Sequence, residues 1–540
     1  MKSIYNLLSI LLVALLISCT DKKDFETTDL LEKESNYEVV KDIILCNNEF
    51  QIDQSGEIKV QFIVNPSTAK FTYDSDIKKS QILLNIITTR SNSSYIIHPD
   101  KYRLENVEAL KDDSGNVRQG LYTATIKDLN KMIPYNDKVS LVIKQLTKSG
   151  KEYLITSNII NIKNKITLPI IHISTPNNVD ITSKEEWIEN TCIKIINTDG
   201  TIDYIGENDN IRGRGNSTWL YPKKPYAIKL DKKSSVLGMP KHKRWVLLAN
   251  WMDRTLIRNH VAFEISRRVG LEYTPRGKFV ELVLNGEILG NYYLCEQIKV
   301  DENRLNITEI GINDVDEESI TGGYLLEIDE YFDEINKFRT PIKNYPVNIK
   351  EPDEDILNNK QLEYITNYFA EIEDILYNNK QKDIAEYIDF ESFAKWFILY
   401  ELVGSYEPNN PKSCYMFKDR NGKLKAGPAW DFDWGTFTPG KYKFRISQAL
   451  YYEMLLKNPT FINVLKECWS ISKENLNDIE QFIRDEASTN EISANSNIEM
   501  WPINTTTNGD EQMSYEEAVC RMIESLNNNI KVIEKCINEL

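Results

Sequence analysis

The sequence predicts an α+β chain in which an N-terminal β-sandwich of immunoglobulin-like type precedes a mixed domain with a helical C-terminal part. Between residues 39 and 165 apolar and polar residues alternate, as in Ile58–Val64 and Val139–Ile143, and turn signals separate the runs. Strand-like runs are mixed with one helix in residues 166–350, and apolar residues recur at helical spacing in much of residues 351–540. A chain of 540 residues can form two or three domains with full cores.

Local signals define the elements of the mixed region. Asn285-Gly286 is typical of a two-residue hairpin turn, which would join strand Phe279–Leu284 to strand Ile288–Ile298. A helix is predicted after Asp253, which can cap its start, and Gly270 would end it.

The rest of the chain is predicted to be mostly helical. Helices are expected within residues 353–403 and 447–540, except for a loose stretch near residues 488–512. These patterns predict an N-terminal lobe over about residues 166–350 and a helical C-terminal lobe over about residues 351–540.

The first residues have the pattern of a bacterial lipoprotein signal. Residues 1–18 contain a positive charge and a short apolar run, and Leu16-Ile17-Ser18-Cys19 resembles a lipobox. We expect cleavage before Cys19, lipidation of its thiol and a polar tether over residues 19–38. The protein would then be attached to the outer membrane only by its lipid, facing the periplasm or the cell surface. An ordinary secretory signal is the alternative.

Composition excludes several classes of protein. The net charge of −16 argues against broad nucleic-acid binding. The four histidines do not pair at metal-binding spacing, and neither a CxxC nor a GxSxG motif occurs. A zinc ribbon and a serine hydrolase are therefore not indicated.

The segment Trp430-Asp431-Phe432-Asp433-Trp434-Gly435 places two carboxylates among aromatic residues. If the segment is extended, Asp431 and Asp433 point to the same side. Two oxygen donors in a rigid apolar surround suit Mg²⁺ that carries phosphate groups. We therefore predict a metal site at these two residues.

A second segment could bind the phosphates themselves. Arg212, Gly213, Arg214, Gly215, Asn216 and Ser217 combine glycines that allow close backbone approach with arginines that can bind phosphate bidentately. A Gly-rich basic segment is also a common turn.

A lysine follows this segment in a predicted strand. Lys229 could face solvent, or it could enter a cleft and neutralise phosphates as the strand lysine of protein kinases does. Glu264 and Glu296 compete as its ion-pair partner, and the sequence does not choose between them. A Gly-rich segment, strand lysine, helix, hairpin, helical block and aspartate motif follow one another in the order found in kinase-like phosphotransferases.

The same stretches resemble the CotH kinase family, which is named for a spore-coat protein. The resemblance covers residues from about 165 to 440 and includes Ile211–Leu230, Trp245–Gly270, Phe279–Ile298, Gly322–Asp329 and Pro411–Phe437. It implies an atypical protein-kinase-like fold that binds ATP with a divalent metal and phosphorylates protein serine.

The resemblance also implies residue roles. Asp431 matches the metal-binding aspartate, Asp433 is its neighbour, and Lys229 matches the strand lysine. The family has a catalytic aspartate in a loop before the metal motif, where this chain has Glu407 as the nearest carboxylate. Ser413 stands where an asparagine would serve a second metal.

Two functions follow from these patterns. The first is an exported, lipid-anchored kinase of the CotH type that transfers phosphate from ATP to an unidentified acceptor protein. The second is a kinase-like surface protein that has lost catalysis and binds or adheres to a partner. A carboxylate-based hydrolase that uses Asp431 and Asp433 is a weaker third option, because two carboxylates side by side on one strand have poor geometry for flanking a sugar bond.

Overall fold

The structure is a computed structural model that describes residues 167–540, apart from Asn379, and the strands found between residues 42 and 163. The chain divides into two compact units, Met1–Ile166 and Thr167–Leu540. The predicted signal peptide (1–18), Cys19 and the tether (19–38) lie outside the described residues. Within the described part of the chain, no helix is both long and apolar enough to cross a membrane.

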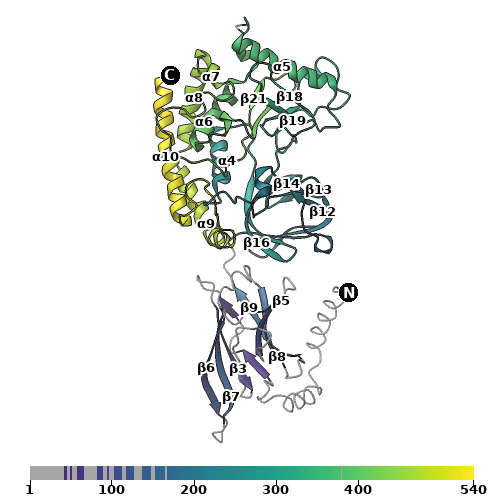
Figure 1. The fold of residues 1–540 in the computed structure, drawn as a ribbon, viewed down its shortest axis with the longest axis vertical. Coiled ribbons are helices and arrows are strands. Elements are labelled where there is room, and N and C mark those ends of the chain that lie inside the picture. Colours follow the sequence, from purple (N-terminus) through teal and green to yellow (C-terminus); the bar gives the residue numbers. More distant parts are fainter. Residues whose placement is uncertain are drawn as a thin grey trace. The chain divides into compact units, whose positions relative to one another are not determined.

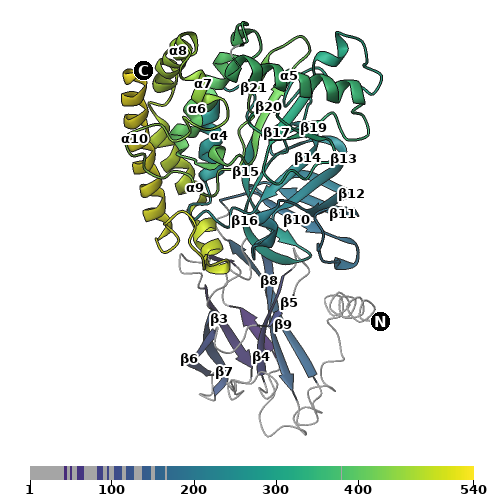
Figure 2. The ribbon, with the colours of Figure 1, turned by 45° about the horizontal axis from the view of Figure 1, so that its top comes forward.

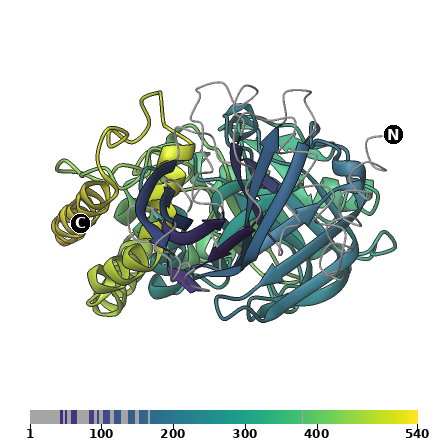
Figure 3. The same ribbon diagram turned by 90° about the horizontal axis from the view of Figure 1, so that it is seen from below.

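The first unit contains nine described strands, which are among the purple to blue arrows in Figure 3. One sheet has the order β1-β3-β7-β6 and the other β2-β9-β8-β4-β5. The predicted alternating runs fall in β3 and β8. The strands are β1 (Asp42–Leu45), β2 (Glu49–Gln51), β3 (Ile58–Asn65), β4 (Ile82–Thr88), β5 (Ser94–Ile96), β6 (Tyr102–Lys111), β7 (Val117–Ile126), β8 (Asp137–Leu146) and β9 (Glu152–Lys163). The immunoglobulin-like packing of these sheets stays a prediction.

The second unit begins with a closed barrel of the order β10-β11-β12-β13-β14-β16-β15, in which β10 and β15 pair in parallel (Figure 1). Alternate side chains such as Ile228 and Trp245 fill its interior, because successive strand residues point to opposite faces. The predicted Asn285-Gly286 hairpin is confirmed. The strands are β10 (Ile170–Ser174), β11 (Ile188–Ile196), β12 (Ile202–Gly213), β13 (Tyr226–Val236), β14 (Met239–Leu248), β15 (Gly277–Leu284) and β16 (Glu287–Glu296).

A five-stranded sheet of the order β18-β19-β17-β20-β21 follows the barrel (Figure 2). It joins strands from both sides of residue 350, so the segment after residue 350 is not purely helical. The strands are β17 (Tyr324–Ile328), β18 (Lys337–Arg339), β19 (Pro346–Glu351), β20 (Cys414–Lys418) and β21 (Leu424–Ala426).

The helices pack on one core around α6, whose side chains are buried on nearly all sides. In Figure 1, α10 runs along the outside of this helical part, in yellow. The helices are α4 (Arg258–Val269), α5 (Asn359–Tyr377), α6 (Phe390–Val403), α7 (Tyr452–Leu455), α8 (Pro459–Asn475), α9 (Ile479–Met500) and α10 (Tyr515–Glu539).

Two predicted helix boundaries are wrong. Helix α4 begins at Arg258 and not directly after Asp253, because a turn separates the two residues. The Asp253 carboxylate accepts the backbone N–H of Thr255 within this turn and the backbone N–H of Arg258 at the helix start, each at 2.8 Å. Gly270 ends α4 in the left-handed conformation, as predicted. The loose stretch expected near residues 488–512 begins only after Met500, because buried residues on α9 keep its last turns packed.

Candidate functional site

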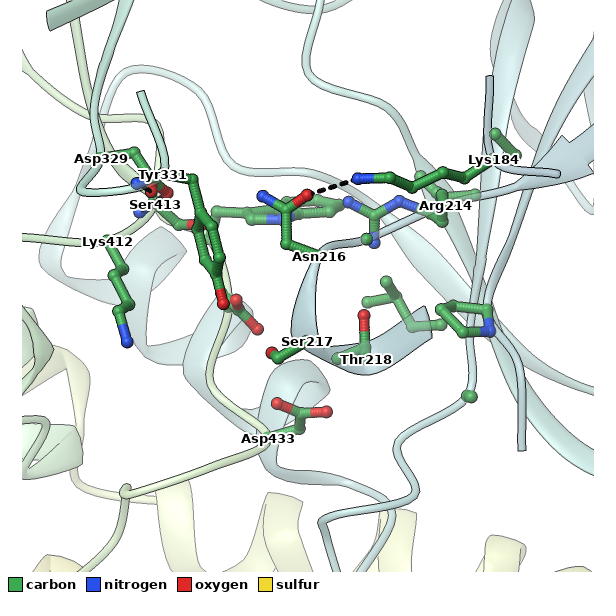
Figure 4. A pocket seen from close by; sticks show the side chains of 18 of the residues that line it. Lys184, Arg214, Asn216, Ser217, Thr218, Asp329, Tyr331, Lys412, Ser413 and Asp433 are labelled. Carbon is green, nitrogen blue, oxygen red and sulfur yellow. Dashed lines mark hydrogen bonds between the residues drawn. The ribbon is translucent and has the colours of Figure 1, made fainter. Parts of the chain in front are cut away.

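A cavity of about 660 Å³ lies in the second unit between the barrel and the five-stranded sheet β18-β19-β17-β20-β21. Loops that precede and follow the strands of this sheet in the sequence also line the cavity. Residues from distant parts of the sequence line it, and Figure 4 shows Asn216, Ser217 and Asp433 among them. The side-chain oxygen of Asn216 accepts a hydrogen bond from Lys184 at 2.7 Å. The predicted residues that line it are Arg212, Gly213, Arg214, Gly215, Asn216, Ser217, Glu407, Asp431 and Asp433. The fold therefore brings together most of the residues that were predicted as a site.

The Gly-rich segment (residues 212–218) continues directly from β12 into a tight turn. A Cβ on Gly213 would lie 2.4 Å from the Trp219 ring, and one on Gly215 would lie 2.0 Å from the Thr218 hydroxyl oxygen. Gly215 also has a φ of +85°, which other residues rarely adopt. Both glycines are therefore needed for the backbone to pass this close to the cavity.

The two arginines of this segment have different surroundings. Arg212 donates to the carbonyl of Glu185 at 3.0 Å, and its guanidinium lies 4.6 Å from the centre of the Trp187 ring. Arg214 lies over the Trp430 ring, and its charge opposes the effect of burial on the pKa of Asp431. Arg214 is therefore the arginine that faces the carboxylates, whereas Arg212 anchors the segment.

The Asp-Phe-Asp loop (residues 430–437) is not extended, so the predicted strand geometry is wrong. Asp431 has a φ of +67°, and its carboxyl group lies close enough to that of Asp433 for each to affect the pKa of the other. The two carboxylates are close because of this turn rather than because of strand alternation.

Acidic side chains gather around this loop, and their surroundings disfavour the charged form of each. Burial raises the pKa of Asp433 well above its usual range, and the neighbouring Asp431 adds to the effect. Burial, followed by the charges of Asp431 and Asp433, raises the pKa of Glu407 to about 9. Such repulsion between buried carboxylates is relieved by a cation.

The donor set fits a metal that also binds a substrate. Among the described residues, no group of three or more His, Cys, Asp or Glu side chains is arranged to hold a metal by itself. Mg²⁺ commonly uses one or two carboxylates together with substrate phosphates and water. Asp431 and Asp433 match this use, with Glu407 close to both.

Buried polar side chains support the loop from helix α4. The Asn259 side-chain oxygen accepts the backbone N–H of Phe432 at 2.8 Å, and its amide donates to Asn250 at 3.0 Å. Arg258, which is 2% exposed, forms ion pairs with Asp253 and Asp510. The segment that resembles the CotH family at residues 245–270 therefore acts here as a frame for the Asp-Phe-Asp loop.

The predicted kinase-like ion pair is wrong. Ala227 on β13 lines the cavity, but Lys229 on the same strand does not. Lys229 lies two residues further along β13, where it pairs with Arg244 of β14. Glu264 instead pairs with Arg267 and Arg268 on the surface of α4.

Glu296 is also committed elsewhere. Its carboxylate pairs with Arg276 at 2.9 Å and accepts the Tyr273 hydroxyl at 3.1 Å. Both glutamates therefore belong to local ion pairs rather than to a lysine pair in the cavity.

Sequence reasoning missed several cavity residues. Asp329 accepts the backbone N–H groups of Tyr331 at 2.8 Å and Ser413 at 2.9 Å. The bond to Asp329 holds the backbone of Ser413, which also lines the cavity. Lys350 pairs with Glu327 at 3.4 Å on the adjacent strand. Gly322–Asp329 was among the stretches resembling the CotH family, and this was the available signal for Glu327 and Asp329.

One comparison with known proteins matches the part of the chain that supplies most of the cavity lining. A search among curated proteins found no match to the chain. The family model described as CotH kinase protein matches residues 211–539, which is more than half of the 540 residues and includes every predicted cavity residue. The chain therefore belongs to the CotH kinase family, whose members are atypical kinase-like proteins.

Proposed function

We propose that the protein is an atypical kinase that transfers phosphate from ATP to a serine of an acceptor protein, with a divalent metal such as Mg²⁺. One observation carries the proposal: a single cavity gathers the Gly-rich segment, two adjacent aspartates and Glu407. Its volume of about 660 Å³ is within the range of small-molecule and cofactor sites.

Each residue has a role that suits phosphoryl transfer. Arg214 would bind phosphate oxygens bidentately beside the turn at Gly215. Asp431 and Asp433 would hold the metal, which supplies charge neutralisation for the phosphates. These groups act by positioning and by electrostatic stabilisation, which account for most catalysis in this class of reaction.

Glu407 would accept the proton of the acceptor serine. The serine oxygen bonds to the γ-phosphorus, the bond from that phosphorus to the bridging oxygen breaks, and ADP leaves. A cation beside Asp431 favours the ionised form of Glu407, because positive charge lowers the pKa of a nearby carboxyl. The glutamate is one methylene longer than aspartate, so the acceptor hydroxyl would lie further from its backbone.

The predicted lipid anchor completes the proposal. Lipidation of Cys19 would place the kinase on the outer membrane, in the periplasm or at the surface, with the first unit as a spacer. Replacing Cys19 with Ala should abolish incorporation of a labelled fatty acid. Incorporation by the Cys19→Ala protein would contradict the assignment of this thiol.

The central test measures nucleotide binding with and without Mg²⁺ by calorimetry. We expect binding that requires Mg²⁺ and is lost in Asp431→Ala, together with any phosphoryl transfer. Asp355→Ala, which removes an exposed aspartate that does not line the cavity, is the matched control. Full transfer by Asp431→Ala, or no binding of ATP by the parent at millimolar Mg²⁺, would refute the proposal.

The second candidate is a kinase-like binding or adhesion protein without turnover. The position of Lys229 outside the cavity lining and a glutamate at residue 407 favour it. If Asp431→Ala retains binding to an isolated partner and the parent shows no transfer, this function holds instead.

A further inference from the structure

The Asp-Phe-Asp loop is bound by a side chain that comes from the other end of the domain. Asn508 lies in residues 501–514, between helices α9 and α10, and is 7% exposed. Its side-chain oxygen accepts the backbone N–H of Gly435 at 2.8 Å. Its amide donates to the carbonyl of Asp433 at 2.9 Å and to that of Met252 at 3.1 Å. A single carboxamide therefore makes three hydrogen bonds to backbone groups of two other segments.

These bonds are not what holds residues 501–514 in place. Trp501 donates from its indole nitrogen to the carbonyl of Leu289 at 2.9 Å at one end of the segment. At the other end Arg254 donates to the carbonyl of Met513 at 2.6 Å, and Asp510 pairs with Arg258. The segment is anchored without Asn508, so the bonds of Asn508 constrain the Asp-Phe-Asp loop.

The loop needs such constraint on both sides of Asp433. Asn259 holds the backbone N–H of Phe432 on one side, and Asn508 holds Asp433 and Gly435 on the other. Asp431 has a φ of +67°, a conformation that is unfavourable for a residue with a side chain.

We infer that Asn508 is a positioning residue that fixes the Asp431 and Asp433 carboxylates in the geometry that binds a divalent cation. The identity of the cation rests on the proposed function, whereas the positioning of the loop does not. Side chains that orient metal ligands commonly change metal affinity by about 10–100-fold when they are removed. The inference therefore gives the loop between α9 and α10 a direct part in the site.

The first measurement is amide hydrogen exchange of the full-length metal-free protein, read by mass spectrometry. In Asn508→Ala we expect peptides covering residues 432–437 to exchange about tenfold faster, since Gly435 loses its acceptor and the loop loses its restraint. Peptides elsewhere in the second unit should be unchanged. Asn504→Ala is the matched control, because Asn504 is an exposed asparagine in the same segment.

The second measurement is the Mg²⁺ concentration that gives half-maximal ATP binding. We expect it to rise about tenfold in Asn508→Ala, with the affinity for ATP at saturating Mg²⁺ within twofold of the parent. Asn508→Asp keeps the acceptor for Gly435 but cannot donate to Asp433. Asn508→Asp should show the same rise in the Mg²⁺ concentration for half-maximal ATP binding. This variant replaces Asn508→Ala in the test if Asn508→Ala does not fold.

The outcomes separate the inference from the proposed function. Unchanged exchange in residues 432–437, or faster exchange throughout the second unit, overturns the inference even if the protein binds ATP. If the parent does not bind ATP, the proposed function fails, and a local exchange change in Asn508→Ala still supports the positioning role. A normal Mg²⁺ requirement in both Asn508 variants also overturns the inference.

Discussion

Replacing Glu407 with Gln should stabilise the metal-free protein at neutral pH. Burial and the charges of Asp431 and Asp433 raise the pKa of Glu407 to about 9, from an ordinary value of 4.5. The folded protein therefore binds a proton that the unfolded chain releases above pH 4.5, and its stability falls as the pH rises from 4.5 to 9. Glutamine is neutral at every pH, so the stability of the variant does not fall in this way as the pH rises.

The size of the effect follows from the same shift. Three pH units separate 4.5 from 7.5, and each unit corresponds to about 1.4 kcal/mol. The free energy of unfolding of Glu407→Gln should therefore exceed that of the parent by up to about 4 kcal/mol at pH 7.5. The difference should vanish near pH 4.5. Mg²⁺ should stabilise the parent more than the variant, because a cation removes the repulsion that the substitution also removes.

Urea unfolding followed by tryptophan fluorescence measures this difference. All nine tryptophans lie in the second unit, so the signal reports on the part of the chain that contains the cavity. Glu330→Gln, at an exposed glutamate near the cavity, is the control and should show no pH-dependent gain. A Glu407→Gln protein that is equally or less stable than the parent from pH 5 to pH 8.5 would show that Glu407 is not held among repelling carboxylates.

Two further predictions concern other charged residues. Arg214→Met should weaken ATP binding about 10–100-fold through loss of charge-assisted hydrogen bonds, whereas Lys229→Met should change the affinity less than twofold. Calorimetry measures both affinities. A larger loss in Lys229→Met than in Arg214→Met would refute the assignment of Arg214 as the side chain that binds phosphate. Arg258→Met should lower the free energy of unfolding by about 3–5 kcal/mol, because Asp253 and Asp510 would stay buried without a counter-charge. A loss below about 1 kcal/mol in urea unfolding would contradict a stabilising role for this bridge.

Local patterns predicted the elements of the second unit where short-range physics decides the structure. Asn285-Gly286 forms the predicted hairpin, because both residues adopt positive φ values at little cost. Gly270 ends α4 for the same reason. The end of α9 was predicted too early, because its polar last turns are helical through packing at buried positions such as Asn490 and Ser493.

The site was predictable where residue type itself limits the chemistry. Adjacent aspartates and a Gly-rich basic segment indicated metal and phosphate binding, and the fold places both in one cavity. Lys229 was misassigned because strand alternation gives the face on which a side chain lies but not how far along the strand the cavity extends. Asn508 was missed because an asparagine in a polar loop has no distinguishing local pattern.

The sequence by itself determined which residues can bind a phosphate and a cation, since those properties belong to the side chains at Arg214, Asp431 and Asp433. Only the tertiary structure decided which arginine faces the carboxylates, how Asp431 turns toward Asp433, and that Asn508 restrains the loop between them. These outcomes depend on contacts between residues far apart in the chain, and such contacts are set by the packing of the whole domain rather than by neighbouring residues.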